Sequence, residues 1–425
     1  MREMKDSGIE WIGQIPKDWK IIKGKYVLEY LQKPVKDDDG VITCFRDGEV
    51  TLRSNRREDG FTLSDKEIGY QGIDVGDLVV HGMDGFAGAI GISDSRGKAS
   101  PVLNVFNSKY SKRYLMYYLR SMAFSNVFIA LASGIRVRSC DLSWNKLANL
   151  PYPTTSYEEQ TEIVRYIDSQ CSEIDATAED IQKEISLLED YKKSVITEAV
   201  TKGLNPDAEM KDSGIAWIGE IPKGWKIIRL KYITNSIGDG LHGTPNYDDL
   251  GTIFFINGNN LGNRKISITE KTNRLTEKEY KKCGVLKLDK RTLLMSLNGT
   301  YGTLSMYDNE PIMLSKSVGY INVCNKETKE YLYYFLQSPL AQSQMKISLA
   351  GTTIANLSLA TVRNLKICLP SICEQQQIAD YLDSKCSEID AIIADKKRQR
   401  GILTEYKKSL IYEYVTGKKE VPVHE

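Results

Sequence analysis

The chain has 425 residues, 41% of them hydrophobic and 27% charged, a composition typical of a soluble globular protein with two to four domains. No apolar run approaches the ~18–20 residues that a membrane span requires, and the N-terminus lacks the apolar stretch of a signal peptide, so we expect a cytoplasmic protein. Eight scattered cysteines without a CxxC pair, and only three histidines, argue against a zinc site and for reduced thiols.

The net charge is only +1, but it is unevenly distributed along the chain. Residues 156–205 carry a net charge of −7 and residues 371–425 carry −1, so the rest of the chain carries +9. A polyanion such as DNA could contact this positive remainder through its phosphates. Ordinary surface charge is the alternative interpretation.

Three segments of the chain, which we call the frame, occur twice, whereas the stretches between them do not. Residues 4–27 return at 210–233 with 18 of 24 positions identical, and two further segments repeat with a common offset of 215: 159–176 as 374–391 and 191–201 as 406–416. The two inserts, about 28–157 and 234–372, share almost no identity. A duplicated frame that carries two divergent modules predicts recognition of two different targets at a fixed separation.

The first insert is predicted to be a compact α/β or α+β module. In residues 73–93 apolar and polar residues alternate and glycines recur, which is typical of strands joined by tight turns. Residues 112–121 are rich in Tyr and Leu and are predicted to form a helix. Arginine is the side chain best suited to bidentate contacts with guanine edges or phosphates. The candidate DNA-binding residues here are Arg46, Arg53, Ser54, Asn55, Arg56 and Arg57, with Arg136 and Arg138 in a later loop. Surface loops with no ligand are the alternative.

A long helix is predicted from about Glu158 to Lys202, ending before Gly203 and Pro206. Its apolar residues recur every seven positions, which is typical of a coiled-coil seam, and such a helix needs a partner helix. The seam residues are Ile167, Ile174, Ile181, Leu188 and Val195, with a second row at Val164, Cys171, Ala178 and Ile185.

The second insert has the same strand-and-turn texture at 288–307 and a similar helix at 329–338, which predicts a shared scaffold with different specificity. Its candidate contacts differ in kind, because asparagine pairs naturally with adenine edges and glycine allows close backbone approach. The candidate DNA-binding residues are His242, Thr244, Asn246, Asn257, Asn259, Asn260, Arg264, Thr352, Thr353 and Asn356.

A second long helix is predicted from Glu374 to about Tyr414, as the partner of the first. Its apolar face consists of Ile378, Leu382, Ile389, Ile393, Leu403, Tyr406 and Leu410. The basic block at 396–400 interrupts this face, so the seam is weaker there or the block faces the acidic first helix. The heptads alone do not distinguish a parallel pair from an antiparallel one.

The motifs of common enzymes are missing. The chain has no phosphate-binding GxxxxGK[ST] loop, no nucleophile elbow and no HExxH motif, and the glycines of 82–91 are better explained as turn glycines. We therefore predict no catalytic residue and no metal site. A stand-alone nuclease or methyltransferase is disfavoured for the same reason.

Several sequence motifs, which occur in order and partly in duplicate, resemble those of the specificity (S) subunits of type I restriction–modification systems. They are the MKDSGI…WIG…IP…W phrase at 5–19, a Leu-Pro followed by Glu-Gln at 150–160, YKKS…VTKGL at 191–204, and the second MKDSGI phrase at 210–225. HGTPNY at 242–247 also resembles a phrase of one class of that family's target recognition domains, and the first insert lacks it.

The resemblance implies an α+β fold, with two mixed α/β target recognition domains separated by two long helices that form an antiparallel coiled coil, as a pseudo-two-fold internal repeat. The implied domains are 1–157 and 205–372 for target recognition, and 158–204 and 373–425 for the conserved helices. Each recognition domain would read one half of a bipartite, asymmetric DNA site, and the coiled coil would set the spacer.

The resemblance also implies a non-catalytic subunit with several partners. These are double-stranded DNA, two copies of an adenine methyltransferase subunit, and restriction (endonuclease/translocase) subunits, with no membrane partner. S-adenosylmethionine, ATP and Mg²⁺ would be used by the partner subunits and none by this chain. The alternative is a structural coiled-coil scaffold that joins two protein-binding modules.

Overall fold

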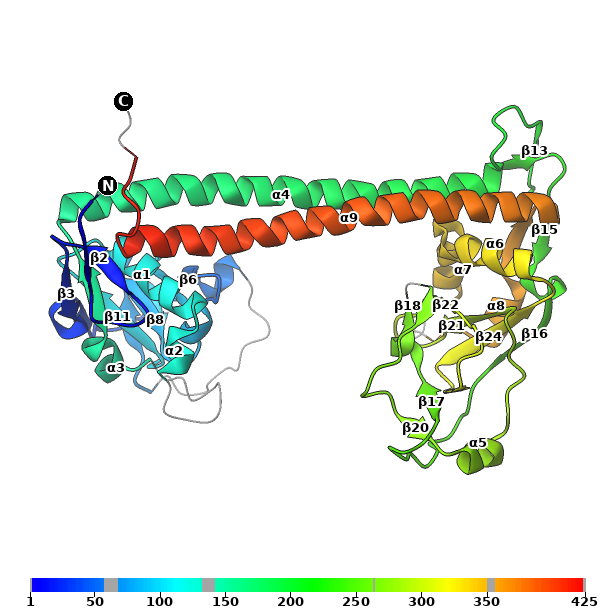
Figure 1. The fold of residues 1–425 in the computed structure, drawn as a ribbon, viewed down its shortest axis with the longest axis horizontal. Helices are drawn as coiled ribbons and strands as arrows, with labels where there is room; N and C mark the ends of the chain where they lie inside the picture. Colours follow the sequence, from blue (N-terminus) through cyan, green and yellow to red (C-terminus); the bar gives the residue numbers. More distant parts are fainter. Residues whose placement is uncertain (1, 57–67, 132–141, 263, 350–355, 423–425) are drawn as a thin grey trace. The chain divides into compact units, whose positions relative to one another are not determined.

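The computed structural model describes residues 2–56, 68–131, 142–262, 264–349 and 356–422 (Figure 1). The chain forms two compact units, Met1–Gln182 with Arg398–Glu425, and Lys183–Lys397. Two long helices, α4 (Tyr157–Lys202) and α9 (Ile372–Val415), each contribute one end to each unit. Their bounds agree with the predicted helices to within two residues. The four-part domain division stays a prediction.

The first unit is built around a four-stranded antiparallel sheet. Its order is β4 (Glu29–Leu31), β11 (Leu103–Asn107), β8 (Leu78–His81) and β9 (Ile90–Ile92). The frame adds a hairpin of β1 (Met4–Asp6) with β2 (Gln14–Pro16) and a pair of β3 (Lys20–Lys23) with β12 (Pro151–Thr154). The helices are α1 (Lys112–Phe124), α2 (Val127–Ala130) and α3 (Trp144–Asn149).

The second unit repeats this topology strand for strand. Its sheet has the order β16 (Thr234–Asp239), β24 (Val318–Val323), β21 (Thr292–Ser296) and β22 (Leu304–Met306). The frame pairs are β13 (Met210–Asp212) with β14 (Glu220–Pro222) and β15 (Lys226–Arg229) with β25 (Lys366–Leu369). Its helices include α6 (Lys326–Gln337), α7 (Pro339–Ser348) and α8 (Leu359–Asn364). The predicted shared scaffold is confirmed.

The two units differ in the strands added beside this shared sheet. The first unit has the hairpin β5 (Ile42–Cys44) with β6 (Val50–Leu52), and the pair β7 (Gln71–Ile73) with β10 (Gly97–Ala99). The second has β17 (Ile253–Ile256) between antiparallel β20 (Arg274–Leu275) and parallel β23 (Ile312–Leu314). A short hairpin of β18 (Leu261–Gly262) with β19 (Lys265–Ile266), and helix α5 (Glu277–Cys283), complete it.

Within each unit, α4 and α9 run antiparallel (Figure 1). In the first unit Lys407 pairs with Asp175 at 2.6 Å and Arg400 contacts Gln182, so the numbers rise along one helix as they fall along the other. In the second unit Lys192 pairs with Asp390 at 2.6 Å and Lys396 with Glu184 at 2.5 Å. The basic block at 396–400 therefore faces acidic residues of α4, one of the two predicted alternatives.

Most of the predicted seam is buried. Ile167, Ile174, Ile181 and Val195 of α4, and Leu382, Ile389 and Leu410 of α9, are buried, whereas Leu188 and Leu403 are half-buried. The assignment of Tyr406 to the apolar face is wrong, because its side chain is 49% exposed.

Repeated aromatic residues join each unit's globular part to its helix ends. The buried indoles of Trp19 and Trp225 donate to Glu159 and Glu374, in each case at 3.2 Å or less. The hydroxyl of Tyr114 lies 2.7 Å from the Val415 carbonyl oxygen. Its repeat equivalent, Tyr331, donates to the Val200 carbonyl oxygen near the end of α4 at 3.2 Å. These bonds satisfy buried polar groups at the point where the frame meets the module.

Candidate nucleic-acid interface

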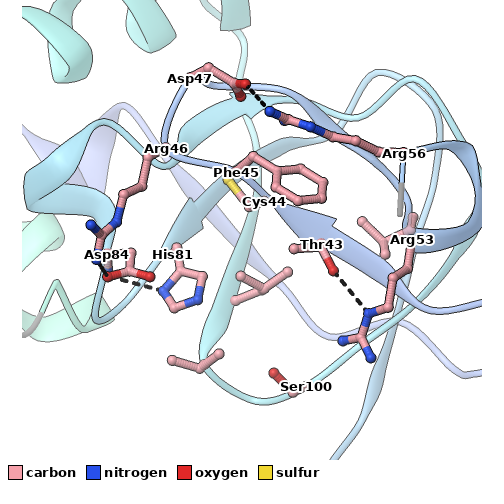
Figure 2. A pocket seen from close by; sticks show the side chains of 13 residues that line it. Thr43, Cys44, Phe45, Arg46, Asp47, Arg53, Arg56, His81, Asp84 and Ser100 are labelled. Atoms are coloured by element: carbon pink, nitrogen blue, oxygen red, sulfur yellow. Dashed lines mark hydrogen bonds and ion pairs between the residues drawn. The ribbon is translucent and has the colours of Figure 1, made fainter. Parts of the chain in front are cut away.

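A pocket in the first unit gathers three of the predicted arginines (Figure 2). It is formed by the β5–β6 hairpin, the 3₁₀ turn at Arg53–Asn55 and the end of β8. Its polar lining residues are Thr43, Arg46, Asp47, Arg53, Arg56, His81, Asp84 and Ser100. Arginines that are separated in the sequence thus share one concave surface.

Arg56 is held by both charge and an aromatic ring. Its guanidinium pairs with Asp47 at 2.6 Å and Glu49 at 3.0 Å, and its central carbon lies 4.1 Å from the centre of the Phe45 ring. The hydrogen bond to Asp47 raises the pKa of Arg56 above its usual value, so the side chain is always charged. A cation stacked on a ring is pre-oriented and retains donors for a ligand.

The other arginines of the pocket are also tethered. Arg46, 66% exposed, pairs with Asp84 at 2.9 Å (Figure 2). The Nε of Arg53 lies 3.4 Å from the Thr43 hydroxyl. Because each cation lies near a carboxylate or hydroxyl, the pocket presents donors and acceptors side by side. Such a mixture suits base edges better than a bare cationic patch would.

His81 is a pocket residue that the sequence did not single out. Its Nδ1 accepts the backbone N–H groups of Met83 at 3.2 Å and Asp84 at 3.0 Å, which leaves its proton on Nε2. Burial lowers the pKa of His81 below its usual value, and nearby Asp84 partly opposes this shift. His81 is therefore a neutral hydrogen-bond donor at neutral pH. No motif marked it, because β8 and the β5–β6 hairpin are not paired and lie far apart in the sequence, and only the folded chain places them around one pocket.

The remaining candidates of the first unit divide into three groups. Ser54 is exposed beside Arg53. Asn55 donates through Nδ2 to the Thr51 hydroxyl at 2.9 Å, so this side chain stabilises the turn. Arg57, Arg136 and Arg138 lie outside the described residues.

In the second unit, the HGTPNY segment follows β16 and is largely exposed. His242, 71% exposed, lies 2.8 Å from Asp239, and Thr244 is exposed. Asn246 contacts Glu279 of α5 through its backbone N–H at 3.3 Å and its side chain at 3.4 Å. This segment offers polar groups from a loop that α5 supports.

The asparagines at 257–260 form a capped 3₁₀ turn. The Asn257 side chain accepts the Asn259 N–H at 2.9 Å, and the Asn260 side chain accepts the Asn257 N–H at 3.0 Å. Asn257 and Asn260 are thus used largely for turn geometry. Asn259 is exposed and its side chain takes no part in this capping box.

Three predicted residues near the end of the second insert are less informative. Thr352 and Thr353 lie outside the described residues. Asn356 is exposed and forms a β-bridge with Asn298. Arg264 is not gathered with the asparagines, since its guanidinium contacts Glu330 and Asp383.

Within the described ranges, no group of three or more His, Cys, Asp or Glu side chains is arranged to hold a metal ion. Over the same part of the chain, no helix is long and apolar enough to cross a membrane.

Comparisons with known proteins point to one family. Residues 222–399 match the model of the type I restriction modification DNA specificity domain. The chain is 24% identical to a putative type I restriction enzyme MjaX specificity subunit from Methanocaldococcus jannaschii, over 96% of each chain. It is also 24% identical to the EcoBI specificity subunit of Escherichia coli, over 74% of this chain and 68% of that one.

Two solved structures share the fold. One is a chain from a study of complex assembly and conformational transition of the type I R-M system, with a TM-score of 0.69, 16% identity, and coverage of 95% of this chain and 99% of that chain. The other is the HsdS subunit of Thermoanaerobacter tengcongensis, with a TM-score of 0.51, 16% identity, and coverage of 95% and 98%. The similarity therefore extends over both units.

Proposed function

The chain belongs to the family of type I restriction–modification specificity subunits, and on that premise we propose that it is the non-catalytic subunit that reads the DNA target of such a complex. Each unit reads one half of a bipartite, asymmetric site. Bases are read in the first unit by the pocket around Arg46, Arg53 and Arg56, and in the second by the segments around His242 and Asn259.

The repeated topology carries this proposal. The two units share one sheet order and one frame, yet differ in the strands added beside the sheet. The candidate contacts lie on or next to those differing segments. A repeated frame with differing reading segments is the arrangement expected of two recognition modules with different targets.

The helix pair is proposed to fix the distance between the two half-sites. Antiparallel ion pairs in both units support a two-helix coiled coil. At ~1.5 Å per residue each helix is long compared with one turn of DNA, about 34 Å. The number of unspecified base pairs in the target then follows from the frame and is independent of the bases that are read.

We further propose that two copies of a methyltransferase subunit dock on this chain, with restriction subunits in the full complex. Exposed apolar side chains recur at equivalent frame positions, which favours one kind of partner bound twice. The pairs are Tyr26 with Tyr232, Tyr157 with Ile372, Leu187 with Ile402, and Tyr191 with Tyr406. S-adenosylmethionine, ATP and Mg²⁺ are then used by the partners, and the target adenine is flipped into the methyltransferase.

Methylation mapping tests the function. Genomic DNA from a host that expresses this chain with its methyltransferase partner is sequenced for modified adenines, beside a host that lacks this chain. The expected result is a new bipartite motif with an unspecified gap. A short continuous motif, or no new methylation with an assembled complex, would favour the alternative of a scaffold joining two protein-binding modules.

A further inference from the structure

Arg264 joins the second unit's variable part to the frame. It lies in the β18–β19 hairpin with a φ of +68°, in the left-handed region that residues other than glycine rarely adopt. Its guanidinium contacts Glu330 of α6 and Asp383 of α9, and one of its nitrogens lies 3.2 Å from the Tyr334 hydroxyl. The Tyr333 ring centre is 5.2 Å away. A backbone in this conformation is retained where its surroundings hold it.

The hairpin is connected in turn to the asparagine turn. Asn260 and Ser267 exchange two hydrogen bonds, of 2.7 and 2.9 Å. On the other side, the Arg264 carbonyl accepts the Met306 N–H at 2.8 Å, and the Ser305 hydroxyl donates to the Lys265 carbonyl at 2.9 Å. A displacement of Arg264 would therefore be transmitted to the turn that presents Asn259.

The first unit shows why this arginine is needed. The frame aspartate occurs twice, as Asp168 and Asp383, and each contacts a tyrosine of the packed helix, Tyr117 of α1 and Tyr334 of α6. In the first unit, Arg113 of α1 pairs with Asp168 at 2.6 Å. The aligned position in α6 is Glu330, of opposite charge. Two carboxylates would then face each other, and Arg264 bridges them from the hairpin.

We propose that Arg264 is a positioning residue for recognition of the second half-site: its bridge between Glu330 and Asp383 fixes the asparagine turn relative to α9. The inference rests on the proposed function and extends it, because it makes base discrimination by one unit dependent on an ion pair with the frame helix. The corresponding pair in the first unit, Arg113 with Asp168, is formed between two helices, α1 and α4.

The test compares two variants of the complete methyltransferase complex. Arg264→Gln removes the bridge and leaves Glu330 and Asp383 facing each other. Arg264→Gln combined with Glu330→Arg recreates in the second unit the helix-to-helix pair of the first. The readouts are the thermal unfolding midpoint and the extent of methylation at cognate sites and at sites with one changed base in either half.

With Arg264→Gln, discrimination against a wrong base falls about tenfold in one half of the motif and is unchanged in the other. That half is the one altered by Asn259→Ala. The double variant regains the unfolding midpoint but not the discrimination. Asp168→Asn, the matched control, leaves discrimination in that half unchanged.

Three results would overturn the inference. They are unchanged discrimination with Arg264→Gln, equal loss in both halves, and recovery of discrimination in the double variant, which would make Arg264 merely structural. If Arg264→Gln alone prevents the complex from assembling, the double variant serves as the test, because it keeps an arginine paired with Asp383. Failure of the proposed function is distinct, because the wild-type complex would then methylate no bipartite motif.

Discussion

The candidate DNA-reading arginines that line the first unit's pocket are already hydrogen-bonded or ion-paired without DNA. Arg56 has Asp47 and Glu49, and Arg46 has Asp84. Exposed ion pairs of this kind contribute little to stability because water and salt screen them, so exchanging a carboxylate for a guanine edge costs little. The pairing restricts the rotamers of long side chains, and it discourages binding to phosphates at random. Specificity is favoured over bulk affinity.

Arg56→Ala tests this interpretation at the first unit. The change is expected to reduce methylation of cognate sites by roughly tenfold to a hundredfold, as loss of a bidentate base contact would. The loss is expected to come from the half of the motif that the first unit reads. The other half keeps its discrimination, and the unfolding midpoint hardly changes because the ion pairs are exposed. Methylation sequencing and thermal unfolding of the same complex measure both.

A matched control for this change is Arg291→Ala in the second unit. Arg291 also forms an exposed pair, with Asp289 at 2.6 Å, but it lies directly before β21 and is not one of the candidate contacts. It is expected to leave both halves unchanged. Equal loss in both halves with Arg56→Ala would contradict separate reading by two units.

At the scale of elements, local patterns predicted much of the fold and long-range pairing did not follow from them. The heptad of Ile167, Ile174 and Ile181 indicated α4 within one residue of its start, because helix periodicity is a local property. The parallel pairing of β17 with β23 joins residues 58 positions apart, such as Phe254 and Ile312, and leaves no local pattern. No periodicity indicates it.

The candidate site was predictable only in part for the same reason. Arginine and asparagine clusters marked the regions, but turn chemistry uses Asn257 and Asn260, and the frame uses Arg264. The role of Arg264 could have been inferred from the sequence, because Arg113 and Glu330 occupy aligned positions with opposite charge. Such a charge reversal beside a repeated aspartate indicates that a compensating cation comes from elsewhere.

An ion-pair network around the buried carboxylate of Asp39 holds the strand pair β7–β10 to the segment before β5. Arg96 lies 2.8 Å from Asp39 and 2.6 Å from Asp74, and its guanidinium also donates to the Pro34 carbonyl at 3.0 Å. The hydrogen bond from Arg96 lowers the pKa of Asp39 to about 2, from an unperturbed 3.8. The folded state thus favours the ionised carboxylate.

Asp39→Asn is therefore expected to destabilise the first unit by about 1–2 kcal/mol at neutral pH. Because the folded pKa is the lower one, the wild-type advantage is complete above about pH 4 and disappears as the pH falls through about 2. Urea unfolding at pH 7, 4 and 3 measures it. The exposed neighbour Asp37→Asn is the control, and a difference between wild type and Asp39→Asn that did not shrink on acidification would contradict the assignment.

At the scale of the whole molecule, duplication separates what varies from what is shared. The units share Trp19 and Trp225, Tyr114 and Tyr331, and Asp168 and Asp383 at equivalent positions, all between module and helices. Residues that are repeated at equivalent positions are expected to have the same role in both units. Internal packing is that role for the buried residues, but it does not explain why exposed residues are also repeated.

Tyr26 and Tyr232 are exposed residues of this kind. They are 63% and 69% exposed, each beside a lysine whose ammonium lies 4.9 or 5.1 Å from the ring centre. An amphipathic tyrosine with an adjacent cation is typical of interface anchors. Since the same pair occurs in both units, we expect the same partner subunit to bind at each.

Native mass spectrometry of the methyltransferase complex tests this expectation. Tyr26→Glu or Tyr232→Glu alone should remove one partner copy, and the double variant both, because a buried carboxylate in an apolar contact is strongly unfavourable. Val75→Glu and Leu250→Glu change exposed apolar residues of the inserts, 66% and 93% exposed, and should retain both copies. Loss of both copies from one single variant would mean that the partners bind cooperatively, and not independently at two repeated surfaces.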